Sequence, residues 1–268
     1  MENKEADMLR LIVDTSKLNK SYHIYEPDPE AIGHNDVIND WHIERIRRLN
    51  ATANHLIASL QRLQLFGDAL SKLDEISQKS ENYGALVINH RAACRDICIN
   101  IDIYVKSITS FCRYYFFMDK AMTDDTIVWY QTFDQYKQIE GWKYIENFLA
   151  ACKRMFKNPD TKFIINIRNR ETHNESPLEL INYKFEKDRP MPVPVEYVIS
   201  NQTLHNKIVS VIELLTSVIA SLQELLENIS PADIRKYLST QTDYLENILK
   251  PEDRYKEERK YFKQFQCK

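Results

Sequence analysis

Apolar residues recur at intervals of three and four along most of this chain, which is the spacing of one face of an α-helix. The first long series predicts a helix over residues 36–66, with Gly67 as its natural end. A second long helix is expected over 84–118, packed antiparallel against the first. The apolar positions that define the first helix are Ile46, Leu49, Ala53, Leu56, Leu60 and Leu63.

Two further helical series complete the pattern. One covers residues 142–156 and stops at Asn158-Pro159, after which Asp160 can cap the next helix. The other has the most regular spacing in the chain, 4-3-4-3-4-3-4, and predicts a helix of about seven turns facing a bundle. Its apolar positions are Leu204, Ile208, Val211, Leu215, Val218, Leu222, Leu225 and Ile229. The predicted fold is all-α, an antiparallel bundle of four long helices.

Two connections between these helices have compositions that predict local structure. Residues 177–199 hold two apolar runs around a proline-rich turn, which predicts a small hairpin or extended flap before the last core helix. The prolines there, Pro190, Pro192 and Pro194, cannot donate ladder hydrogen bonds. Residues 120–140 are rich in aromatic side chains, so we expect this segment to pack on the bundle as a short helix.

We expect a single domain over 1–268, with an N-terminal extension (1–35), the helical bundle (36–229) and a C-terminal helical extension (230–268). Additional helices are predicted at 6–18 and 231–249. The end of the chain after Pro251 mixes basic and aromatic residues, a composition that suits either single-stranded nucleic acid or simple docking on the bundle. Docking is the favoured interpretation, and no function is assigned to this tail.

Composition supports a helical, cytoplasmic protein. Only 4 of the 268 residues are glycine, which disfavours sheets and phosphate-binding loops that need glycine. The net charge is −3, so an RNA site would have to be a local basic patch. Five cysteines without a spaced framework indicate a reducing compartment. The charged N-terminus does not resemble a secretory signal, and no uncharged apolar run approaches about 18 residues, so no membrane span is expected.

The strongest candidate for chemistry is a polar hexapeptide that follows a short apolar run, Arg168-Asn169-Arg170-Glu171-Thr172-His173. Either the helix emerges into solvent there, or a polar site is built, because buried charge is costly unless it is paired. Asn169 and His173 are four residues apart and share a helix face, whereas Arg168 and His173 lie about 140° apart. Their convergence would need the reach of Arg168, or a second copy of the helix related by a two-fold axis.

Arg168-Asn169-x-x-x-His173, placed just before the last long helix of a bundle, resembles the Arg-polar-x(3–5)-His motif of the HEPN superfamily (higher eukaryote and prokaryote nucleotide-binding domains). The resemblance covers residues 36–229. It implies a homodimeric, metal-independent endoribonuclease, of the kind found in toxin–antitoxin and phage-defence systems, with two motifs lining one cleft. The partners it implies are RNA and an antitoxin or regulator, and it calls for no metal or cofactor.

The implied chemistry is consistent with these side chains. His173 could act as base or acid, because an unperturbed imidazole has a pKa of about 6.5. Arg168 would clamp the phosphate with its planar donor fork. Asn169 could orient the imidazole or bind a phosphate oxygen, and Arg170 would add positive charge for substrate binding. The expected product has a 2′,3′-cyclic phosphate.

Other interpretations of the same residues remain open. Glu171 could simply pair with Arg168 or Arg170 on a surface helix end. Catalysis has been lost in some members of the family, so a non-catalytic interaction or nucleotide-binding module is the alternative function.

A second cluster, His90, Cys94 and Cys98, is spaced i, i+4, i+8 on one helix face and could offer three metal ligands. Core packing is favoured for it, since no fourth ligand is visible.

Overall fold

The computed structural model describes residues 14–26, 37–72, 81–115, 137–172, 181–186, 189–194, 201–229 and 233. These ranges contain six helices and one two-stranded hairpin: α2 (Thr15–Tyr22), α4 (Val37–Ser71), α5 (Glu81–Tyr115), α7 (Trp142–Lys157), α8 (Pro159–Thr172), β1 (Ile181–Glu186), β2 (Arg189–Pro194) and α9 (Asn201–Asn228). Apart from the hairpin, the regular structure in these ranges is helical, which confirms the all-α prediction.

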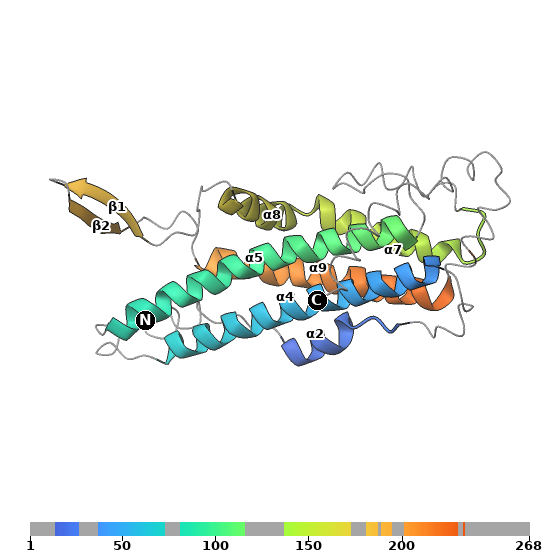
Figure 1. Cartoon of the computed structure of the whole chain (residues 1–268), viewed down its shortest axis with the longest axis horizontal. Helices are drawn as coiled ribbons and strands as arrows, with labels where there is room; N and C mark the ends of the chain where they lie inside the picture. Colours follow the sequence, from blue (N-terminus) through green and yellow to red (C-terminus); the bar gives the residue numbers. More distant parts are fainter. Residues whose placement is uncertain are drawn as a thin grey trace.

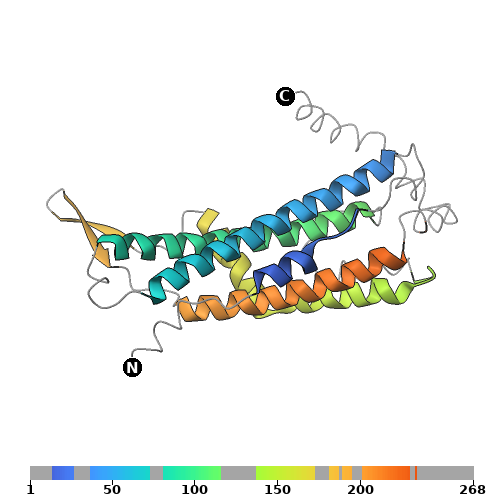
Figure 2. The same ribbon diagram turned by 90° about the horizontal axis from the view of Figure 1, so that it is seen from below.

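The long helices bury the apolar positions that the spacing predicts. Helices α4 and α5 lie side by side along their length, and α7 lies beside α9 (Figures 1 and 2). One continuous core joins them, and the predicted series on α4 and α9 are buried in it. Burying a leucine or isoleucine side chain contributes roughly 1.5–3 kcal/mol. The core is therefore built from helix faces whose 3-4 spacing is visible in the sequence.

Helix α2 is attached to the core through one aromatic residue. The hydroxyl of Tyr22 donates to the carbonyl oxygen of Ile212 on α9 at 3.1 Å. Its ring stacks on Tyr104 of α5, with centroids 5.5 Å apart and planes 12° apart. Tyr22 thus joins α2 to two of the long helices. The helix predicted at 6–18 is described only from Thr15 onward, and it continues to Tyr22.

The ends of α4 and α5 differ from the prediction. Gly67 does not end α4, which continues to Ser71. Leu70 lies in the added turn and is buried, so its packing outweighs the cost of a glycine inside a helix, about 1 kcal/mol. Helix α5 begins at Glu81, earlier than expected. Helix α7 begins at Trp142, as predicted, and ends at Lys157.

Helices α7 and α8 meet at a corner of one residue, Asn158. Its φ of −65° and ψ of 131° are extended, as the following Pro159 requires. The Asn158 side-chain oxygen accepts hydrogen bonds from the backbone N–H groups of Asp160, at 2.7 Å, and Thr161, at 3.2 Å. Asn158 is therefore the N-cap of α8, and the prediction that Asp160 caps this helix is wrong.

The hairpin lies at the end of the molecule where α5 begins (Figure 1). Its strands pair antiparallel, with Tyr183 opposite Pro192 and Phe185 opposite Pro190. The predicted hairpin is thus present, but the prolines lie in strand β2 and not in the turn. A two-stranded ladder tolerates them because alternate backbone N–H groups point away from the partner strand.

Helix α9 is the one described helix that is long and apolar enough to cross a membrane, by length and composition. Over Gln202–Asn228 its most apolar 18-residue window has a mean hydropathy of 1.6. A core helix has the same composition, and the apolar face of α9 is buried in the core. The predicted helix at 231–249, the tail after Pro251 and most of the 120–140 connection lie outside the described residues.

Candidate functional site

Helix α8 carries the candidate motif and lies against both α5 and α9 (Figure 1). Thr161, Ile164 and Ile167 are buried and form the face that it turns to the core. Arg168 follows and is half-buried, whereas Asn169 and Arg170 are exposed. The switch from apolar to polar residues therefore coincides with the place where α8 leaves the core.

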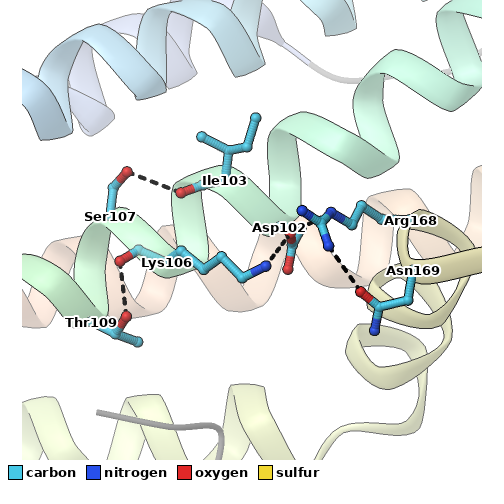
Figure 3. A network of polar contacts seen from close by, with 7 residues as sticks. All are labelled: Asp102, Ile103, Lys106, Ser107, Thr109, Arg168 and Asn169. Carbon is cyan, nitrogen blue, oxygen red and sulfur yellow. Dashed lines mark hydrogen bonds and ion pairs between the residues drawn. The ribbon is translucent and has the colours of Figure 1, made fainter. Parts of the chain in front are cut away.

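Arg168 makes an ion pair with a buried carboxylate on another helix. Its Nε lies 2.9 Å from Oδ2 of Asp102 on α5, and the side chain of Asp102 is only 2% exposed (Figure 3). Lys106, one turn further along α5, places its Nζ 2.7 Å from the same oxygen. Leaving a carboxylate buried without a counter-charge costs several kcal/mol, so these two cations explain how Asp102 is tolerated.

Asn169 extends this network toward solvent. Its Oδ1 accepts a hydrogen bond from Nη1 of Arg168 at 3.1 Å (Figure 3). The Arg168 guanidinium is therefore held on two sides, by Asp102 through Nε and by Asn169 through Nη1. Asn169 contacts the arginine of the motif, a role the sequence does not predict. His173 lies outside the described residues, as does the side chain of Glu171.

The network has a positive outer surface because its anion is hidden. Asp102 contributes one negative charge at the buried end, and Arg168 and Lys106 contribute two positive charges. The Lys106 side chain is 57% exposed and that of Arg168 is 29% exposed. The three side chains together carry a net charge of +1, on a chain of net charge −3, and exposed cations of this kind can bind a phosphate group.

Sequence analysis missed Asp102 and Lys106, which complete the network. Asp102 stands directly after Ile101, at a buried position of α5. A charged residue on the buried side of a predicted helix is a signal that a partner of opposite charge lies nearby. The partner itself could not be identified, because it requires knowing that α8 packs against α5.

A second ion pair attaches α8 to α9. Lys207 Nζ lies 2.7 Å from Oδ1 of Asp160 and 4.7 Å from the centre of the Phe163 ring. The hydrogen bond from Lys207 lowers the pKa of Asp160, with a smaller opposing effect of burial and a further lowering by Ser210. Asp160 thus fixes the first turn of α8 on α9, although it does not cap the helix.

A third cluster lies in the core and consists of His90, Cys94 and His205. The ligand atoms of these three buried residues lie within 4.8 Å of one another, and Cys94 Sγ is 4.0 Å from His205 Nε2. The two imidazole rings are 5.3 Å apart and inclined at 61°. The sequence suggested Cys98 as the third possible ligand; the structure brings His205 of α9 into the group instead. Burial raises the pKa of the Cys94 thiol to about 12, while the nearby Arg91 opposes that rise.

No protein-family model matches this chain, and no curated protein or solved structure matches it either.

Proposed function

We propose that this chain is a metal-independent endoribonuclease of the HEPN type, which cleaves RNA to leave a 2′,3′-cyclic phosphate. The observation that carries the proposal is the clamped, half-buried guanidinium of Arg168 beside the exposed Lys106. In this proposal α4, α5, α7 and α9 are the four long antiparallel helices of the HEPN bundle. Helix α8 then carries the Arg-Asn-x-x-x-His motif.

The contacts of Arg168 favour phosphate binding. A guanidinium has five N–H donors, and the bonds to Asp102 and Asn169 use two of them. A planar fork that is already oriented loses little conformational entropy when it binds a phosphate. Preorganised donors stabilise charge as it develops in a transition state, and removal of one such donor typically costs about 10²–10³-fold in rate.

The remaining steps use residues of the motif and its surroundings. A base removes the proton from the ribose 2′-hydroxyl, the 2′-oxygen attacks phosphorus, and the leaving 5′-oxygen receives a proton. His173 serves as base or acid, since its ordinary pKa is close to neutral pH. Arg168 stabilises the phosphorane, Asn169 holds Arg168 in position, and Arg170 and Lys106 bind neighbouring phosphates.

The proposal also includes the oligomeric state of the protein and its biological context. Two copies of the chain form a homodimer in which both motifs line one cleft, so that groups from two α8 helices act on one RNA. The enzyme works in the cytoplasm, in phage defence or in a toxin–antitoxin pair, under an antitoxin or another regulator.

The test is cleavage of end-labelled RNA by the purified full chain in EDTA. Wild type should give cyclic-phosphate ends, and Arg168→Ala and His173→Ala should lose at least about 10²-fold in rate. Arg154→Ala is the matched control, because Arg154 is an exposed arginine on α7 that contacts Ser217 and lies outside the network. Equal cleavage by all four proteins would point to a contaminating nuclease and contradict the proposal.

A second candidate is a non-catalytic module that binds RNA, a nucleotide or a protein through the same surface. The observation that favours it is the burial of Asp102, since an arginine paired with a buried carboxylate can serve stability alone. The two functions separate in one comparison. An RNA-binding module would retain RNA on a filter at low salt and leave it uncut, a module for a nucleotide or a protein would neither retain nor cut it, and the nuclease would release cyclic-phosphate products.

A further inference from the structure

We propose that His90, Cys94 and His205 form a binding site for a single Zn²⁺ in the core, with a structural role separate from the proposed ribonuclease chemistry. Two ligands come from α5 and the third from α9. Two imidazoles and one thiolate are a donor set that zinc uses in proteins, with a fourth position left for water.

The geometry of the three side chains is close to what zinc requires. Zn–N bonds of about 2.0–2.1 Å and Zn–S bonds of about 2.3 Å place tetrahedral ligand atoms about 3.3–3.6 Å apart. Here all three atoms lie within 4.8 Å of one another, and Cys94 Sγ and His205 Nε2 are 4.0 Å apart. Side-chain shifts of about 1 Å therefore bring the three ligands onto one ion, with no change in the helices.

The positions of the ligands along the chain also suit a site. His90 and Cys94 are four residues apart on α5 and so project from the same face of the helix. His205 meets them from α9, its ring inclined to that of His90. All three residues are buried, which excludes the ordinary explanation of surface histidines and cysteines that gather by chance.

The negative charge that would balance a bound cation comes from Cys94. The ligand form of cysteine is the thiolate, and metal binding displaces its proton. Arg91 is also buried near Cys94, and its positive charge favours the thiolate but repels a second cation. Thiolate binding offsets one of the two charges of the ion, which lowers the cost of placing zinc in the core.

The site would join the two helices on which α8 rests. Both α5 and α9 contact α8, and Cys94 precedes Asp102 by eight residues, about 12 Å along α5. The ion is therefore too far from Arg168 to touch a phosphate bound there. Its expected effect is on the stability of the α5–α9 pair.

The first measurement is metal binding by the full chain, expressed and purified in reduced form without added metal. Titration with Co²⁺ should give one equivalent per chain, with a thiolate-to-cobalt charge-transfer band and the intense visible bands of tetrahedral cobalt. Zn²⁺ should displace it. X-ray absorption of the zinc form should show one sulfur at about 2.3 Å and two nitrogens at about 2.0–2.1 Å. Absence of the charge-transfer band in folded wild type would overturn the proposal.

The matched variants are Cys94→Ala and Cys98→Ala, which remove two buried cysteines one helical turn apart on α5. Zn²⁺ at roughly 100 times its Kd should raise the Tm of wild type and Cys98→Ala by about 5–10 °C, and should leave Cys94→Ala unchanged. Equal zinc stabilisation of both variants would contradict the assigned ligand. Because the cobalt spectrum is recorded without RNA, a negative result there says nothing against the nuclease, and a missing nuclease activity says nothing against the site.

Discussion

Arg168 and Asp102 form an ion pair between α8 and α5, with the arginine Nε 2.9 Å from a carboxylate oxygen that is almost completely shielded from solvent. The pair places the guanidinium at the boundary between core and solvent. It also links the stability of the fold to the position of the residue proposed to bind phosphate, so substitutions that remove the charge on either side should change both.

Replacing Asp102 with asparagine should lower the free energy of unfolding by about 1–3 kcal/mol, because the neutral amide leaves Arg168 and Lys106 without their shared counter-charge. Urea unfolding measures the loss. Asp96→Asn is the control, since Asp96 lies on the same helix and pairs with Arg62 at the surface. Its effect should be within about 1 kcal/mol of zero. Equal losses of unfolding free energy in the two variants would show that the buried Asp102 pair contributes no more to stability than the surface pair of Asp96.

Arg168→Lys should distinguish the contribution of the positive charge to RNA cleavage from that of the planar guanidinium. The lysine keeps one positive charge near Asp102 but lacks the planar fork, so RNA cleavage should fall by about 10²-fold while stability changes little. The measurement is single-turnover cleavage together with thermal unfolding. Arg170→Lys provides a comparison at an exposed position of the same helix. Full cleavage activity in Arg168→Lys would mean that catalysis does not depend on the planar guanidinium.

Asn158→Ala should destabilise the chain by about 1 kcal/mol, because two backbone N–H groups in the first turn of α8 lose their acceptor. Asn158→Gly should cost less, since glycine is tolerated as an N-cap and lets water reach those groups. Chemical unfolding of the two variants tests this order. The reverse order would mean that the corner depends on the conformation of Asn158 and not on its side-chain oxygen.

The Asp160–Lys207 pair should make stability depend on pH in the acid range. The folded-state pKa of Asp160 is lowered below its ordinary value of 3.8, chiefly by the hydrogen bond from Lys207. Its contribution is therefore fully present above that ordinary value and is lost as pH falls through the lower, folded-state pKa.

Because the pair is partly exposed, its contribution at neutral pH should be about 0.5–1 kcal/mol. Unfolding free energies of wild type and Asp160→Asn should differ at neutral pH and converge in strong acid. A constant difference across the pH range would exclude this carboxylate as the cause.

The helices could be predicted from the sequence because each apolar series reflects burial on one face. The series on α4 and α9 correspond to buried positions residue by residue. Helix ends were harder to predict, because a tertiary contact overrode the stop signal of Gly67 and a neighbouring residue took the capping role expected of Asp160. Leu70 packs in the core beyond the glycine, and Asn158 takes the capping role, leaving Asp160 to bind Lys207.

The site was predictable only where its residues are neighbours in sequence. Arg168, Asn169 and Arg170 attract attention as a run of polar residues, but the partner of Arg168 comes from α5 and depends on how α8 packs. The same holds for the core cluster, in which Cys98 shares the helix face of Cys94 and yet His205 of α9 joins the group. Spacing predicts which residues share a helix face and says little about what another helix brings to it.

The single-residue corner at Asn158 makes α8 a short rigid arm. Arg168 stands ten positions after Asn158, which places it about 15 Å along the helix from the corner. A rotation of about 5° at the corner would displace it by about 1.3 Å, and misplacement of about 1 Å can reduce catalysis by about 10²-fold. Two fastenings resist that rotation, Lys207 near the corner and Asp102 at the tip. The corner at Asn158 therefore sets the direction of α8. The contact with Asp102 lies farther from that corner than the contact with Lys207, so it restrains the position of the Arg168 guanidinium more strongly.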